Sequence, residues 1–202
     1  VEQNPALLHI VPGHLPGETR RSLRDPRVRI VHADPRRFLE SAPAYDLILV
    51  GMPEPASGQA NRFFTREFFE SCRARLGANG VMAFSLQSSE NFWTPQLARR
   101  MRSIHRAALA AFPDVVFLPG RTNVVVCSRG RLTRDPSVQA ARLDSRGIRP
   151  RLVSAAYLRY LYTNDRFREV ARSLENGTAP VNTDARPICY QYTVLLWLSK
   201  FI

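Results

Sequence analysis

The feature that most constrains the fold is a regular alternation of strand-like and helix-like segments over the first 130 residues. Runs rich in β-branched or apolar residues lie at residues 27–34, 45–50, 81–87, 114–120 and 122–130. Helix-like segments lie at residues 4–16, 35–42, 65–80 and 94–113. This alternation predicts an α/β fold with a mostly parallel sheet and helices on both faces. A turn with Pro119 and Gly120 joins the last two runs and predicts a closing antiparallel hairpin.

Local signals predict where several elements begin and end. Asn4 is expected to cap a helix that begins at Pro5, and Thr65 and Thr94 are expected to cap the later helices. Gly77 is expected to end the helix that Thr65 begins. The continuous apolar run at residues 47–50 predicts a buried strand, as is typical of parallel sheets.

Composition indicates one globular domain with a helical appendage, since the chain has 202 residues and 45% of them are hydrophobic. The net charge of +12 comes almost entirely from arginine, because Lys200 is the only lysine. Codon bias in a GC-rich genome would explain this composition. A surface of this charge would also attract nucleic acid or an anionic membrane face, and would repel polyamines.

The cysteines and histidines predict neither a disulfide framework nor a metal site. Cys72, Cys127 and Cys189 are odd in number and widely spaced, which favours a reducing compartment and plain packing. The four histidines form no ligand pattern, so we expect no bound metal.

Residues after 130 change in character and suggest two further segments. Residues 131–180 are helical and rich in arginine, and we expect an accessory helical segment beside a domain at residues 1–130. Residues 181–202 combine a polar turn with an apolar stretch. That stretch is about half the length needed to cross a bilayer. It is either a short buried helix or strand, or the first part of a membrane segment, and we favour the second.

The stretch YDLILVGMPEP, residues 45–55, predicts a candidate active-site loop. A strand ends at Val50, and parallel sheets bind ligands just beyond the carboxyl ends of their strands. Gly51 follows the strand directly, and Glu54 is the only acid in the loop. Two other acids come at strand ends, Glu2 in VEQNP and Asp34 in HADP.

This order of segments and acids resembles the S-adenosylmethionine-dependent transferase fold, a Rossmann-like fold. Within it the chain is most similar to the aminopropyltransferases, the spermidine and spermine synthases. The resemblance implies that Glu2 accepts hydrogen bonds from the ribose hydroxyls and that Asp34 reaches the adenine amino group. Asp34 is equally well placed to cap the helix that begins at Pro35.

The same resemblance shows where this chain departs from the family. The family loop reads Y-D-x-I-x-x-D-x-x-D-P, and its first loop aspartate helps to deprotonate or position the attacking amine. Gly51 stands at that position, and Glu54 stands at the second, which holds the amine chain. Glu54 is therefore the remaining candidate for catalysis and amine binding. Gln87, in the polar loop at residues 87–91, matches a further substrate-binding position.

The ends of the sequence also fit a longer parent protein. The first strand of this fold and its glycine-rich loop would lie before Val1, so the resemblance implies an N-terminally truncated fragment. The turn at residues 182–187, Asn-Thr-Asp-Ala-Arg-Pro, resembles bacterial family members that are fused to integral membrane helices. In that arrangement the domain would lie at the cytoplasmic face of the inner membrane, with the fragment itself soluble.

Three functions remain open at this point. The leading hypothesis is an aminopropyltransferase that uses decarboxylated S-adenosylmethionine, or S-adenosylmethionine, as co-substrate, with a small amine as acceptor and a homodimer as the usual assembly. The second keeps the fold for sensing or scaffolding beside membrane helices, because Gly51 removes the usual base. The third is a nucleic-acid methyltransferase, which only the positive charge favours.

Overall fold

A computed structural model of the protein describes residues 1–89 and 92–199. Glu90 and Asn91 of the predicted polar loop, and the last three residues of the apolar stretch, lie outside the described residues. The chain divides into two compact units, Val1–Pro43 and Ala44–Ile202, and each is described by itself. The predicted segment boundaries at residues 130 and 180 stay a prediction.

The first unit contains three helices, α1 (Pro5–His14), α2 (Gly17–Leu23) and α3 (Pro35–Ser41). The expected cap at Asn4 is confirmed, since its side chain accepts the Ala6 N–H. The strand expected at residues 27–34 is wrong: only an isolated parallel bridge between Glu2 and His32 forms there. Strand propensity becomes a strand only where a neighbour pairs along its length, and here the pairing is limited to one position.

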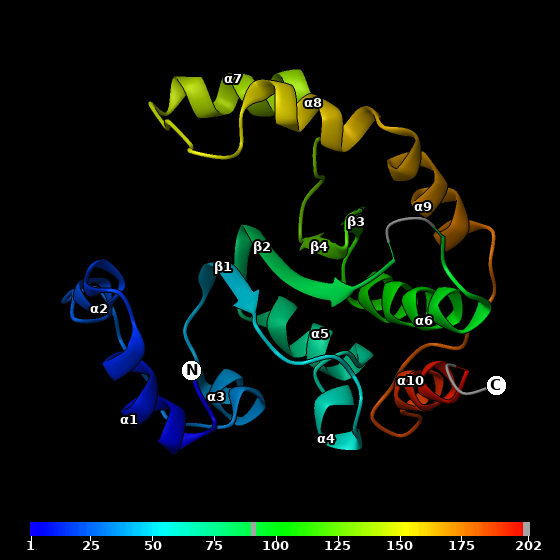
Figure 1. The fold of residues 1–202 in the computed structure, drawn as a ribbon, viewed down its shortest axis with the longest axis horizontal. Coiled ribbons are helices and arrows are strands. Elements are labelled where there is room, and N and C mark those ends of the chain that lie inside the picture. The colour runs from blue at the N-terminus through cyan, green and yellow to red at the C-terminus, as the bar shows by residue number, and fades with distance from the viewer. Residues whose placement is uncertain (90–91, 200–202) are drawn as a thin grey trace. The chain divides into compact units, whose positions relative to one another are not determined.

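The second unit is built on a four-stranded sheet with the order β1-β2-β4-β3 (Figure 1). Its strands are β1 (Tyr45–Val50), β2 (Leu76–Gln87), β3 (Asp114–Leu118) and β4 (Thr122–Ser128). β1 and β2 pair in parallel, whereas β2 with β4 and β3 with β4 pair antiparallel. The closing hairpin is therefore confirmed, and the described sheet is mixed instead of mostly parallel.

One face of this sheet packs against helices and forms the core. α5 (Arg66–Ala74) places Phe69 against Phe84 of β2, with ring centroids 5.4 Å apart. α6 (Pro95–Ala111) places His105 against Phe117 of β3. A short helix, α4 (Gly58–Asn61), precedes α5. The caps expected at Thr65 and Thr94 are confirmed, because each side chain accepts a backbone N–H of its helix.

Two local predictions about this sheet are wrong. β1 is not a continuously buried strand, because Leu47 and Leu49 are 53% and 72% exposed. Leu47 and Leu49 alternate with Ile48 and Val50, which are half-buried, so no residue of the apolar run is fully buried. Gly77 does not end α5; the helix ends at Ala74 and Gly77 lies inside β2. The Tyr45 N–H donates to the Arg75 carbonyl, so pairing with β1 already begins there.

In the described part of the chain, four helices follow the sheet: α7 (Pro136–Ser145), α8 (Ala155–Thr163), α9 (Asp165–Glu175) and α10 (Ile188–Leu198). Asn164 separates α8 from α9 and caps α9 through the Phe167 N–H. The apolar stretch forms α10, which packs on α6 and has Cys189 as its buried residue. Within residues 1–89 and 92–199, no helix has both the length and the apolar character needed to span a membrane.

Candidate functional site

Glu54 connects the loop after β1 to the end of β2. Its Oε1 accepts the backbone N–H of Gln87, the last residue of β2. Its Oε2 lies 3.0 Å from Nη2 of Arg100, and the two side chains are 19% and 7% exposed. The loop is therefore held against the strand end by a hydrogen bond and a largely buried ion pair.

Arg100 projects from α6 into this junction. Its Nη2 also donates to the Gln87 carbonyl at 3.1 Å, and its Nη1 lies 3.5 Å from the Thr193 hydroxyl of α10. Burial lowers the pKa of Arg100 from its usual value, and the Glu54 charge opposes that shift. One guanidinium thus links the candidate loop, the end of β2 and α10.

This geometry determines what Glu54 offers to a substrate. Because the Arg100 charge offsets the Glu54 charge, the pair attracts a cationic amine less strongly than a free carboxylate would. Gln87 contributes its backbone N–H and carbonyl to the junction, and Gln87 is an exposed residue. The loop and Gln87, which the family resemblance assigns to one site, are therefore in direct contact.

Gly51, where the resemblance places an aspartate, has open space around it. A Cβ atom at this position would meet no atom within 4 Å. The backbone there is also outside the left-handed region, since Gly147 is the glycine with a positive φ in the described chain. Neither packing around a Cβ atom nor backbone conformation thus requires glycine at position 51.

The other two predicted site residues, Glu2 and Asp34, lie together in the first unit. The parallel bridge is made by the Glu2 N–H to the Val31 carbonyl, 2.9 Å, and the Ala33 N–H to the Glu2 carbonyl, 3.1 Å. Asp34 follows directly, so both acids come where two parallel segments end. The bridge pairs Glu2 with His32, two residues before Asp34, so the two acids lie on neighbouring segments.

Local hydrogen bonds hold both carboxylates at the chain turns. Glu2 Oε1 accepts the Asn4 N–H at 2.7 Å, and Asp34 Oδ1 caps α3 through the Arg36 and Arg37 N–H groups. A carboxylate has about four acceptor positions, so the Glu2 bond leaves capacity for ribose hydroxyls. The capping role expected for Asp34 is confirmed, and nucleoside binding by the two acids stays a prediction.

Sequence reasoning missed Arg100. The signal was present, because Arg100 falls among Leu97, Met101 and Ile104 on the apolar stripe of α6. An arginine at such a position needs a buried partner. In the described part of the chain, no group of three or more histidine, cysteine or acidic side chains gathers in a way that could hold a metal ion.

The turn at residues 182–187 is a structural clamp between α10 and α5. The buried Asn182 donates through Nδ2 to the Phe64 carbonyl at 2.8 Å and accepts the Cys189 N–H at 3.2 Å. Asp184 accepts the Thr65 hydroxyl at 2.7 Å. These bonds fix the start of α10 beside the start of α5, and α10 in turn touches Arg100.

Comparison with known proteins connects these features to one family. Residues 13–126, more than half of the chain, match the model of the spermine/spermidine synthase domain. A polyamine aminopropyltransferase of Synechococcus sp. (strain JA-2-3B'a(2-13)) is 34% identical over 108 residues, which cover 52% of this chain and 35% of that protein. The enzyme of the same name from Lachnospira eligens is 33% identical over 114 residues, which cover 56% of this chain and 38% of that protein. The match thus spans little more than a third of these relatives.

Solved structures agree on the fold. A spermidine synthase bound to the transition-state analogue AdoDATO superposes with a TM-score of 0.68 at 18% identity, covering 87% of this chain and 60% of that one. The spermidine synthase of Thermotoga maritima gives 0.65 at 17% identity, covering 87% and 59%. Identities this low establish the α/β fold alone, whereas the sequence match over residues 13–126 establishes the relationship. The chain belongs to the spermine/spermidine synthase family.

Proposed function

We propose that this protein acts as an aminopropyltransferase, moving an aminopropyl group from decarboxylated S-adenosylmethionine to an amine. The observation that carries the proposal is the family match over residues 13–126, which includes Asp34, the loop with Glu54, and Gln87. The amine nitrogen attacks the propyl carbon next to the sulfonium, and the C–S bond breaks. The bonding pair stays on sulfur as methylthioadenosine leaves, and the new ammonium loses a proton to solvent or to a nearby base.

In this proposal the chain's own residues hold the two reactants. Glu2 accepts the ribose hydroxyls and Asp34 the adenine amino group, while the Glu54 loop forms the wall on the amine side. Gly51 supplies no base, so the acceptor must arrive with a free lone pair or lose its proton to another group. Glu54 is the only acid in residues 51–55, and the Arg100 charge offsets its charge.

A second function, a non-catalytic scaffold, is favoured by one specific observation. Glu54 is used in the junction with Gln87 and Arg100, which is what a structural acid would do. A domain retained for its shape would keep this junction and would not need an aspartate at position 51.

Methylthioadenosine release separates the two functions. The full-length protein is given decarboxylated S-adenosylmethionine and a panel of diamines, polyamines and less charged amines. Release that falls at least tenfold in Glu54→Ala, but not in the exposed α5 control Glu70→Ala, supports the transferase. Gly51→Asp should raise release with polyamines, because it adds an acid on the amine side and its Cβ atom would meet no atom within 4 Å. Folded protein with no release in any variant supports the scaffold.

We also propose that the domain works at the cytoplasmic face of the bacterial inner membrane as part of a longer protein. The support is α10, an apolar helix on which Leu195 and Trp197 are 41% and 58% exposed. Fractionation of the parent protein tests this proposal, which predicts recovery with the membranes even in high salt. Recovery in the supernatant would contradict it.

A further inference from the structure

The segment that joins α7 to α8 is unusually open. Every residue from 144 to 157 is exposed, and the two helices on either side pack on each other (Figure 1). We call residues 142–160 the basic hairpin. This surface takes no part in the site described above, so an inference about it stands independently of the proposed reaction.

Apolar side chains are concentrated on the basic hairpin. Leu152 is 85% exposed, the highest value among the exposed large hydrophobic residues of the described chain. Ile148 and Val153 beside it are 45% and 39% exposed. On α8, Tyr157 and Tyr160 are 45% and 64% exposed and stack on each other, with ring centroids 6.4 Å apart. Single exposed apolar residues are ordinary, but a cluster of this kind marks an interaction surface.

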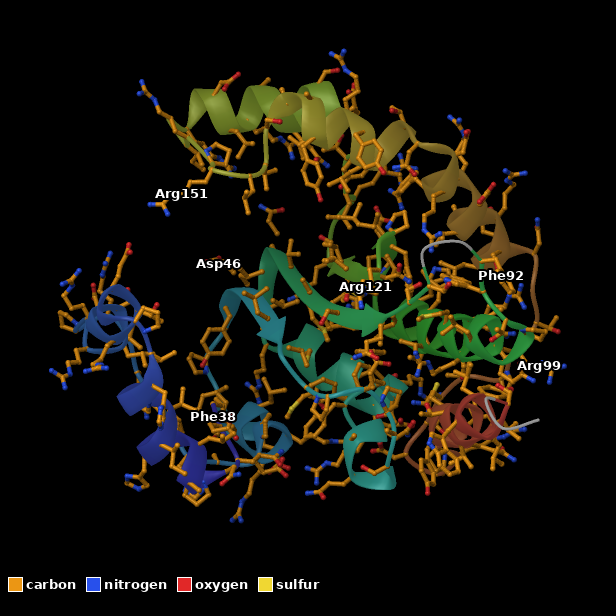
Figure 2. The ribbon with its side chains drawn as sticks, in the orientation of Figure 1. Phe38, Asp46, Phe92, Arg99, Arg121 and Arg151 are labelled. Carbon is orange, nitrogen blue, oxygen red and sulfur yellow. The ribbon has the colours of Figure 1, made fainter. Side chains whose placement is uncertain are left out.

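The same surface is strongly positive. It carries a single acid, Asp144, and five exposed arginines: Arg142, Arg146, Arg149, Arg151 and Arg159. At the tip the two kinds of side chain are interleaved, since Arg149 and Arg151 lie between Ile148 and Leu152. Figure 2 shows Arg151 pointing away from the two helices. A partner must therefore be anionic and also accept aliphatic groups.

We propose that the basic hairpin binds the surface of an anionic lipid bilayer. Lipid headgroups match the arginines by charge, and the acyl boundary beneath them takes up leucine and isoleucine side chains. Tyrosine rings have an apolar body and a polar tip, which suits them to the boundary between these layers. Nucleic acid fits less well, because bases stack on aromatic faces, whereas the most exposed group here is the aliphatic Leu152.

Cosedimentation with vesicles tests the proposal on the full 202-residue chain. Vesicles of phosphatidylcholine with 30% phosphatidylglycerol are compared with vesicles of phosphatidylcholine alone, and binding is expected only to the first. An arginine near an anionic surface contributes about a fivefold factor, so Arg149→Gln with Arg151→Gln should weaken binding by roughly 25-fold. Ile148→Ser with Leu152→Ser should weaken it at least tenfold, since these side chains leave the lipid.

Control variants remove the same charge, or one exposed apolar side chain, elsewhere on the protein. Arg99→Gln with Arg106→Gln lowers the net charge equally on the exposed side of α6, and Leu109→Ser removes an apolar group that is 46% exposed. Both controls should bind within about twofold of the unchanged protein. All changes are at exposed positions, and an unchanged thermal unfolding midpoint confirms that each variant is folded.

Three outcomes would overturn the proposal. The first is equal loss in the hairpin variants and the α6 controls, which would mean that only net charge matters. The second is binding that depends on α10, seen as loss in Trp197→Ser and retention in the hairpin variants. The third is hairpin-dependent binding to a single-stranded oligonucleotide with none to the vesicles, which would assign the surface to nucleic acid.

Discussion

The ion pair between Glu54 and Arg100 leads to a quantitative prediction for stability. Glu54→Gln keeps the shape of the side chain and removes the charge that compensates the buried guanidinium. Arg100 would still donate to the Gln87 carbonyl. Its side chain, which is 7% exposed, would then carry a buried charge without a counter-charge. Burial already disfavours the charged form of Arg100, which is why its pKa lies below the usual value.

The magnitude follows from the burial of the two side chains. Removing one partner of a fully buried pair costs about 3–5 kcal/mol in free energy of unfolding. Glu54 is 19% exposed, so water screens part of this interaction. We therefore expect Glu54→Gln to cost about 2–3 kcal/mol and Arg100→Met about 2 kcal/mol. The double variant should be at least ~1 kcal/mol more stable than the sum of the two single effects predicts, because it leaves no buried charge without its partner.

Urea unfolding of the four proteins in this double-mutant cycle measures the coupling. The exposed pair Arg66 and Glu70, 3.6 Å apart on α5, provides the control cycle, for which we expect a coupling below ~0.5 kcal/mol. Additive effects of Glu54→Gln and Arg100→Met, within about 0.5 kcal/mol, would refute the reasoning. The two residues would then stabilise the junction separately and not as an ion pair.

Three further predictions concern groups outside the loop. Burial lowers the pKa of His105 from 6.5 to about 4. As the pH falls through this range, the unfolded chain binds a proton at His105 before the folded protein does. The free energy of unfolding should therefore fall by about 2–3 kcal/mol between pH 6.5 and pH 4. Unfolding curves should show that His105→Gln loses this dependence and that the exposed control His9→Gln keeps it. Asn182→Ala should cost about 2–3 kcal/mol, because the Phe64 carbonyl and the Cys189 N–H lose their partner; Asn79→Ala, at an exposed position, should change stability by less than ~0.5 kcal/mol. Burial raises the pKa of the Cys127 thiol and raises that of Cys189 to about 12, so a thiol reagent should label neither until urea unfolds the protein; rapid labelling of the folded protein would contradict their burial.

Much of the fold could be predicted because its signals are local. The caps at Asn4, Thr65 and Thr94 are short-range interactions between a side chain and the next turn of backbone, and sequence shows them directly. The closing hairpin was equally visible, since its turn and both strands lie within 15 residues of each other in the printed sequence.

The errors arose where the outcome depends on partners distant in sequence. Residues 27–34 have strand propensity, but only the bridge at His32 forms because pairing depends on residues about 30 positions away. Leu47 and Leu49 were expected to be buried, yet burial depends on which sheet face the helices cover. Gly77 was expected to end a helix, and pairing of β2 with β1 prevailed there. In each case a tertiary contact decided between two locally acceptable structures.

The candidate site shows the same division between local and distant information. The family resemblance assigned Glu54 and Gln87 to one site, and in the structure Glu54 accepts the Gln87 N–H. The charge balance at Glu54 could not be predicted from its own loop, because the neutralising group comes from α6, 46 positions later in the printed sequence. A loop acid that looked available is thus half of an ion pair.

Gly51 and Arg100 act on the amine side of the proposed site in the same direction. At position 51 the chain lacks a carboxylate although a Cβ atom there would meet no neighbour within 4 Å, and at Glu54 a carboxylate is present but its charge is offset. Both features weaken the attraction for an amine that carries several positive charges, since two unit charges 4 Å apart interact by about 4 kcal/mol in a surface-like environment. Restoring an aspartate at position 51 and removing the Arg100 charge would therefore correct the same deficit. Only the first change leaves intact the junction that holds the loop to the end of β2, which is why Gly51→Asp is the more informative substitution for function.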